Sequence, residues 1–135
     1  MILKSYEINK INKNINRLIL FYGKNEGLKN EALNIFIKDK NSISNYEEKE
    51  ILDNENNFME NILSKSLFDS QKFIFIKRAT DKILKIIEIL HLKKLEDTTI
   101  ILSSLISASL SPLLLFTIKF KFEGDIEIFF SLKKL

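Results

Sequence analysis

A chain of 135 residues, with 45% hydrophobic and 29% charged residues, has the size and composition of one folded domain with its own core. It contains no cysteine and one histidine, so disulfides and thiolate metal sites are excluded, and a histidine-based metal centre or catalytic triad is not expected. The net charge of +3 comes from lysines interspersed with acids, which indicates a mixed solvated surface and at most weak contact with DNA.

The N-terminal third begins with a charged stretch that lacks the apolar core of a signal peptide, so a cytoplasmic location is expected. Residues 17–22 then form an apolar run that ends at Gly23 and predicts a buried strand. An amphipathic helix is predicted in residues 28–40, where two adjacent rows of apolar side chains recur: Leu28, Ala32 and Phe36, with Leu33 and Ile37. A polar segment, 39–45, follows, and residues 46–53 are a strand candidate.

A second helix is predicted in residues 55–66, with Asn54 as its N-cap. One face of this helix is marked by Phe58, Met59, Ile62, Leu63 and Ser66. Residues 72–77, KFIFIK, show no polar alternation in their apolar centre, which is typical of a strand covered on both faces in a parallel sheet.

A third helix is predicted in residues 80–94, with Asp81 as its cap. Its inward-facing residues are expected to be Ile83, Ile86, Ile87 and Leu90. Residues 98–102, TTIIL, are β-branched and predict a further strand. This alternation of strands and helices predicts an α/β fold with a largely parallel sheet and flanking helices, in a domain that spans residues 1–102.

The remaining segment, 103–135, is divergent and its fold is not predicted. Residues 98–118 contain no charged residue and are long enough to cross a bilayer. Against a membrane span, serine and threonine are frequent and Pro112 interrupts the run, so a core strand followed by a buried helix or loop is favoured. Residues 119–130 alternate in polarity as a hairpin does.

The turn after the first strand lies where a phosphate loop would lie, between a strand and a helix. A working loop needs two glycines flanking four residues, followed by lysine and a serine or threonine that binds Mg²⁺. Here Gly23 and Gly27 flank only three residues, including Lys24, and Leu28 follows them. Asn30 supplies no hydroxyl. We therefore interpret this segment as a degenerate, non-functional phosphate loop used as a tight turn.

The sequence gives little support for other catalytic or metal-binding residues. An NTPase would end the strand that begins at Lys72 with acidic residues that hold Mg²⁺, whereas here the strand ends in Lys77 and Arg78. His91 is interpreted as a surface residue at the end of a helix. The acidic residues of the strand candidate, namely Glu47, Glu48 and Glu50, are interpreted as a solvated face rather than an acid–base pair. No catalytic residue, cofactor or metal is expected.

Two large apolar side chains, Leu67 and Phe68, stand just before the strand at 72–77, where a solvated connection is usual. Leu67 follows Leu63 by four residues and so continues the apolar row of a helix, while Phe68 lies about 100° further round. One interpretation is a hydrophobic plug at the helix–strand corner. The other is an exposed anchor, which would gain about 2 kcal/mol per side chain in a partner's pocket.

Three motifs together resemble the N-terminal domain of the delta subunit of bacterial DNA polymerase III, over residues 1–102. They are RLILFYGKNEGLKNEAL, KSLFDSQKFIFIKR and TDKILKIIEIL, in this order. The resemblance implies an AAA+-like, phosphate-loop-NTPase-like α/β fold without ATPase activity. It also implies a role as an accessory subunit of a DNA-directed DNA polymerase holoenzyme, in the clamp loader that acts during DNA replication.

In that family a Ser-Leu-Phe element inserts into a hydrophobic pocket of the sliding clamp and helps to open the ring. By this resemblance Leu67 and Phe68 are the clamp anchors and Ser66 shapes the tip, while Lys65 stands where an apolar residue is frequent. Other clamp-loader subunits are the remaining implied partners, and DNA contact is indirect or weak. The family continues through lid and collar domains, and residues 103–135 do not resemble what normally follows the strand at 98–102.

Two alternative functions come from different classes. One is a minimal phosphate-loop nucleotide-binding protein, which the missing hydroxyl and acidic pair argue against. The other is a small membrane-associated protein that uses residues 98–118, although a membrane is not the expected partner.

Overall fold

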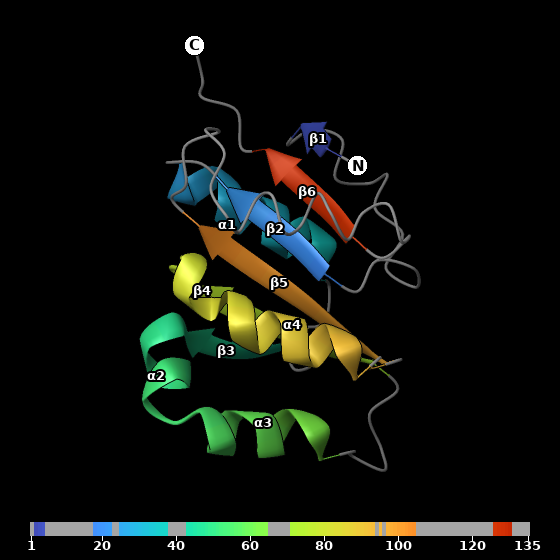
Figure 1. Ribbon diagram of the computed structural model, residues 1–135. Coiled ribbons are helices and arrows are strands. Elements are labelled where there is room, and N and C mark those ends of the chain that lie inside the picture. Colours follow the sequence, from blue (N-terminus) through green and yellow to red (C-terminus); the bar gives the residue numbers. More distant parts are fainter. Residues whose placement is uncertain are drawn as a thin grey trace.

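The computed structural model describes residues 2–4, 18–22, 25–37, 43–64, 71–93, 95, 97–104 and 126–130 (Figure 1). Their strands form one six-stranded sheet in which every pairing between neighbours is parallel. In order across the sheet, the strands are β1 (Ile2–Lys4), β6 (Ile126–Phe130), β2 (Leu18–Tyr22), β5 (Thr98–Ser104), β4 (Lys72–Lys77) and β3 (Ile43–Glu47). The predicted α/β fold with a parallel sheet and flanking helices is therefore confirmed.

Helices cover both faces of the sheet. The helix α1 (Glu26–Phe36) lies on one face, and on the other lie α2 (Glu48–Asp53), α3 (Glu55–Leu63), the 3₁₀ turn η3 (Asp81–Ile83) and α4 (Leu84–Leu92) (Figure 1). Because side chains alternate along a strand, each strand contributes to two hydrophobic cores. Leu18 and Leu20 of β2 pack in the core beneath α3 and α4, and Ile19 and Phe21 pack in the core beneath α1.

The central strands are buried as their sequences predict. Phe73, Ile74, Phe75 and Ile76 of β4 are all buried, and β5 is buried along its whole length. β5 also continues two residues past the predicted end, to Ser104. The four residues predicted to face inward from the third helix are buried at 2% exposure or less, namely Ile83, Ile86, Ile87 and Leu90.

The strand candidate at residues 46–53 is wrong in its boundaries. β3 lies earlier, in the segment that was interpreted as polar, and α2 begins at Glu48. β3 pairs only with β4 among the described strands, and its side chains are mostly half-buried, so its sequence carries little of the hydrophobic signal of a central strand. The backbone N–H of Glu47 donates to Glu50 Oε2 at 3.0 Å, a contact that favours the start of a helix at this point.

Of the two predicted helix caps, Asn54 is confirmed and Asp81 is wrong. Asn54 Oδ1 accepts a hydrogen bond from the backbone N–H of Asn57 at 3.3 Å, as expected for the N-cap of α3. Asp81 is not the cap of the third helix, because the Thr80 hydroxyl accepts from the backbone N–H of Lys82 and Asp81 is the first residue of η3. The predicted second helix is also shorter than expected and ends at Leu63.

The C-terminal segment contributes to the same sheet. Both edges of β6 pair in parallel, with β1 on one side and β2 on the other, so the hairpin predicted in residues 119–130 is wrong for this strand. The period-2 pattern that suggested it indicates a strand but does not identify its partner. Residues 103–104 belong to β5 and 126–130 to β6, whereas 105–125 lie outside the described residues.

The uncharged run at residues 98–118 does not begin as a helix. Its first seven residues form β5, so a helical membrane span over the whole run is wrong. Among the described residues, no helix has both the length and the hydrophobicity needed to cross a membrane.

Candidate functional site

The carboxyl ends of β2, β5 and β4 lie at one edge of the sheet, which we call the carboxyl edge. The connections from two adjacent strands lead in opposite directions across the sheet: β2 is followed, through α1, by β3 on one side, and β5 is followed by β6 on the other side. In open parallel sheets, ligands bind outside the carboxyl ends of the strands at such a switch point. The predicted phosphate loop falls here, with Gly23 and Lys24 outside the described residues and Gly27 as the second residue of α1.

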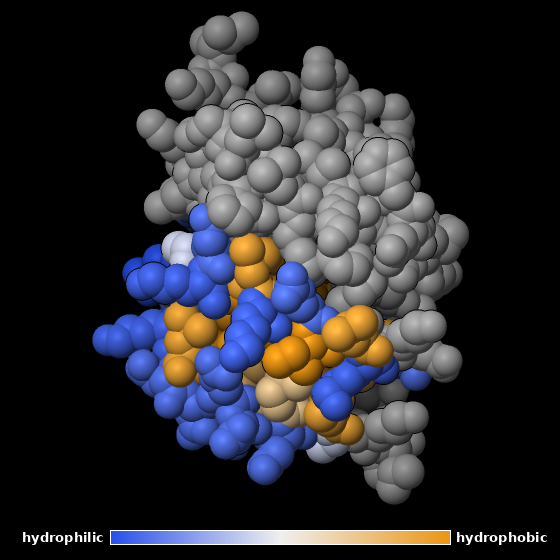
Figure 2. All heavy atoms as spheres, viewed as in Figure 1, coloured by the Kyte–Doolittle hydropathy of each residue, from blue (hydrophilic) through white to orange (hydrophobic). Residues whose placement is uncertain are grey.

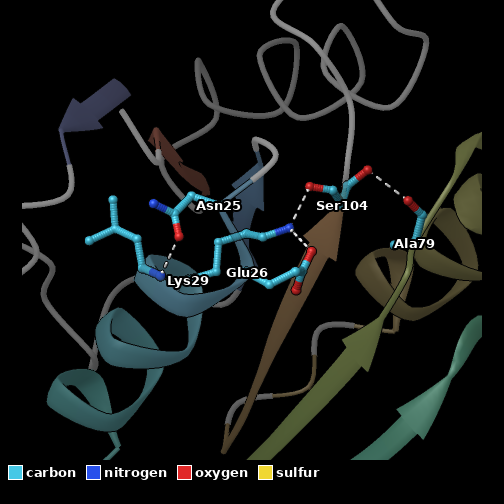
Figure 3. Close-up of polar contacts among 6 residues, drawn as sticks. Asn25, Glu26, Lys29, Ala79 and Ser104 are labelled. Carbon is cyan, nitrogen blue, oxygen red and sulfur yellow. Dashed lines mark hydrogen bonds and ion pairs between the residues drawn. The ribbon is translucent and has the colours of Figure 1, made fainter. Parts of the chain in front are cut away.

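A buried lysine lies at this point. Asn25 is the N-cap of α1, and its Oδ1 accepts a hydrogen bond from the backbone N–H of Leu28 at 2.9 Å. One turn into the helix, the Lys29 side chain is only 1% exposed. Its ammonium lies 2.6 Å from Glu26 Oε1 and donates to the backbone carbonyl of Ser104 at 3.0 Å (Figure 3). A buried ammonium needs a counter-charge and acceptors, and these two groups supply them.

The carbonyl that accepts from Lys29 belongs to a residue that also binds β4. Ser104 Oγ donates to the backbone carbonyl of Ala79 at 2.7 Å (Figure 3). The backbone N–H of Ala79 donates to the carbonyl of Ser103 at 2.9 Å. Polar contacts therefore connect the start of α1 to the end of β5 and to the chain just beyond β4.

The pair Gly23 and Gly27 suggests a shorter loop, and this spacing does not identify Lys29. Counted from Gly23 alone, Lys29 follows by six residues, which is the spacing between the first glycine and the lysine of a phosphate loop. In this alignment Leu28 takes the place of the second glycine and Asn30 takes that of the hydroxyl residue. The spacing from Gly23 was the signal that identifies Lys29, although a lysine is rarely expected in a core.

The interpretation of Glu48 as part of a solvated strand face is wrong. Glu48 is the first residue of α2 and is 7% exposed. Its carboxylate accepts from the backbone N–H of Thr80 and from Thr80 Oγ1, the latter at 2.6 Å. These bonds join the start of α2 to the turn that follows β4, so Glu48 has a structural role that depends on a residue distant in the sequence.

The end of β4 carries basic residues, as the sequence shows, and one of them is paired. Arg78 Nε donates to Glu47 Oε2 at 2.8 Å, and the Arg78 side chain is 76% exposed. This hydrogen bond lowers the pKa of Glu47 and raises the pKa of Arg78. Arg78 also has a φ of 52°, in the left-handed region that is uncommon for residues other than glycine.

Three charged side chains of the carboxyl edge therefore have partners within the protein: Lys29 pairs with Glu26, Arg78 pairs with Glu47, and Glu48 accepts from Thr80. Among the described residues, no group of three or more His, Cys, Asp or Glu side chains could hold a metal ion. The described part of this edge is built for internal contacts.

The second candidate site lies at the opposite end of β4. Ser66, Leu67 and Phe68 belong to residues 65–70, which we call the α3–β4 segment and which lies outside the described residues, as does Lys65. Residues on both sides of it are described. α3 ends at Leu63, and Ser64 has an extended backbone, so α3 does not extend to Leu67 as the helical interpretation required.

Residues on the two sides of the α3–β4 segment bind one carbonyl group. The backbone oxygen of Asn61, in the last turn of α3, accepts from Ser64 Oγ at 2.9 Å and from Lys72 Nζ at 2.9 Å. Such terminal carbonyls have no partner within their own helix, and a cation is favoured beside them. Ser64 precedes the segment and Lys72 is the first residue of β4, so the chain before the segment and the chain after it share one hydrogen-bond acceptor.

Exposed apolar side chains lie on α3 and α4, the longer helices of one face of the sheet. The large described ones on α3 and α4 are Leu63, Ile89 and Leu92, which are 39%, 37% and 77% exposed. Figure 2 shows hydrophobic residues at the surface over these helices. The fourth large one is Ile35, on α1, at 53% exposure. His91 lies in the last turn of α4, and its side chain is outside the described part of the structure.

Comparison of the chain with models of known protein families gives no match, and comparison with curated proteins gives none either. The function is therefore inferred from the motifs of the sequence and from the geometry of the two sites.

Proposed function

We propose that this chain is a non-catalytic clamp-binding module of the type formed by the N-terminal domain of the DNA polymerase III delta subunit. One observation carries the proposal: Ser66, Leu67 and Phe68 fall between α3 and β4, in a segment flanked by two residues that both bind the carbonyl oxygen of Asn61. In the family that the sequence resembles, the same element precedes an apolar strand and enters a hydrophobic pocket of the sliding clamp.

The end of α3 argues against Leu67 as a continuation of the helix core. A continued apolar row would require the helix to reach Leu67, but α3 ends at Leu63. Leu63 is itself 39% exposed, so the apolar row to which Leu67 was assigned is not fully buried even within the helix.

The carboxyl edge supports a function without ATP hydrolysis. Lys29, which has the spacing of a phosphate-loop lysine, is buried against Glu26 and Ser104. Asn30 provides no hydroxyl for Mg²⁺, and β4 is followed by Arg78 where an NTPase would have acidic residues. The AAA+-like identity of the fold is part of this proposal, and the parallel sheet with its loop at a switch point supports it.

Clamp opening would follow from differential binding. An anchor that fits the open clamp better than the closed clamp shifts the equilibrium between them toward the open form. The binding energy of two apolar side chains, about 2 kcal/mol each, is the source of this bias. In the proposed cytoplasmic clamp loader, partner subunits would hydrolyse ATP, and contact of this chain with DNA would be indirect or weak.

A pull-down with the sliding clamp of the same organism tests this function. We expect the wild-type chain to be retained and the Leu67→Ala/Phe68→Ala double variant to be lost. Ile35→Ala is the matched control, because Ile35 is an exposed apolar residue on α1, which covers the face of the sheet opposite α3. Equal retention of the wild type and the double variant would rule out this function for the Ser66–Phe68 element.

A further inference from the structure

The burial of Lys29 is not explained by the clamp-binding function. Lysine is rarely buried, yet this side chain is 1% exposed at the position where ligands bind in parallel sheets. An ammonium has three N–H donors, and Glu26 and Ser104 account for two of them among the described residues. The cluster therefore holds a positive charge at the start of a helix, where a negative group is favoured.

Glu26 provides that negative group from within the chain. It is the first residue of α1, and its side chain is 59% exposed although one carboxylate oxygen contacts the buried ammonium. A phosphate bound to such a loop would face the same positive end of the helix and the same lysine. The carboxylate thus contacts the group that a phosphate oxygen would otherwise contact (Figure 3).

We infer that Glu26 is an internal substitute for a bound phosphate. Its carboxylate binds the Lys29 ammonium and thereby prevents anions from binding at the carboxyl edge. A tethered competitor of this kind acts at an effective concentration of about a millimolar or more. The wild-type chain should accordingly leave inorganic phosphate or pyrophosphate at lower concentrations unbound. Loss of the Glu26 charge should leave a buried ammonium without its counter-charge and create an anion-binding site.

Thermal unfolding of the full chain in inorganic pyrophosphate tests this inference, against sodium chloride at equal ionic strength. We expect a saturable rise of Tm in Glu26→Gln, with a Kd about tenfold or more lower than for the wild type, as the loss of a 1.4 kcal/mol competitor would give. Glu31→Gln is the matched control, because Glu31 is an exposed residue of the same helix. It should behave as the wild type does.

The source of the effect is identified by removing the lysine. Glu26→Gln/Lys29→Met should lose the rise of Tm, and Glu26→Ser provides a second test if the glutamine variant does not fold. Equal pyrophosphate affinity of the wild type and the Glu26 variants would overturn the inference. A rise of Tm that persists without Lys29 would overturn it as well. No clamp is present in this experiment, so its outcome is independent of the proposed clamp-binding function.

Discussion

The two ends of β4 use polar residues in opposite ways. At its carboxyl end, Ala79 and Thr80 are bound to Ser104 and Glu48, and the nearby Lys29 is buried with its charge paired. At its amino end, Lys72 and Ser64 bind the carbonyl of Asn61. One end thus satisfies its polar groups within the fold, while the other lies next to a short segment that carries two large apolar residues, and the residues flanking that segment share one acceptor.

The two ends of β4 are therefore expected to differ in role, with the carboxyl end contributing to stability and the amino end to binding. The end at which a nucleotide enzyme would work is stabilised by contacts among its own residues, so substitutions there should change stability. Substitutions around the α3–β4 segment should change binding to the clamp and leave stability largely unaffected. The predictions below test this separation.

The largest effect on stability is expected for Lys29→Met. This change removes the donor to the buried carbonyl of Ser104 and should lower the free energy of unfolding by about 1–3 kcal/mol. Urea unfolding measures it, with Lys85→Met as a control because Lys85 is exposed on α4. Clamp affinity should remain that of the wild type, and a Lys29→Met variant of normal stability but reduced clamp affinity would reverse the assignment of the two ends.

A somewhat smaller loss is expected for Glu48→Gln. The amide keeps one acceptor oxygen but replaces the other with a donor, so one of the two Thr80 donors loses its partner. The free energy of unfolding should fall by about 1–2 kcal/mol. Glu88→Gln, on the exposed surface of α4, is the matched control. If both variants unfold at the same urea concentration, the Glu48 contacts do not stabilise the carboxyl edge.

At the other end of β4, Lys72→Met should act mainly on binding. Without the bond from Lys72 to Asn61, β4 and α3 are less constrained relative to each other beside the segment. Fixing the chain in its clamp-bound conformation should then cost more free energy. Clamp affinity should fall by about 2- to 10-fold, the range that one hydrogen bond gives. Lys77→Met, at the carboxyl end of the same strand, should leave it unchanged. Equal losses in the two variants would show that Lys72 has no special role.

The smallest effect concerns pH. The hydrogen bond from Arg78 lowers the pKa of Glu47, so the pair contributes stability above the ordinary glutamate pKa and loses it as the pH falls through the lower folded value. The contribution should be slight, because the pair is exposed to solvent. Arg78→Gln should remove this acid-side slope from urea unfolding measured across pH. An unchanged slope would exclude Glu47 as its source.

The sequence predicts the parts of this fold that depend on local pattern. β2, β4 and β5 are apolar runs, and the faces of α3 and α4 follow from the spacing of their isoleucines and of Phe58. β3 was misplaced because its residues are half-buried. The place of β6 between β1 and β2 is a non-local pairing that periodicity cannot indicate.

The candidate sites divide in the same way. Leu67 and Phe68 stand out in the sequence because two large apolar residues are unusual in a connection. Glu48 does not, because its partner Thr80 is 32 residues away along the chain. Lys29 is marked only by its spacing from Gly23, since its partner Ser104 is 75 residues away. Only the fold brings these charged residues to partners that make their burial favourable.

The affinity of the chain for the sliding clamp tests the central claim most directly. Calorimetric titration should give a Kd about thirtyfold higher for Leu67→Ala and for Phe68→Ala than for the wild type, since each change removes about 2 kcal/mol of apolar burial. Ile35→Ala should bind as the wild type does. A Kd that is unchanged in both single variants and in their combination would contradict the claim that this segment is the clamp anchor.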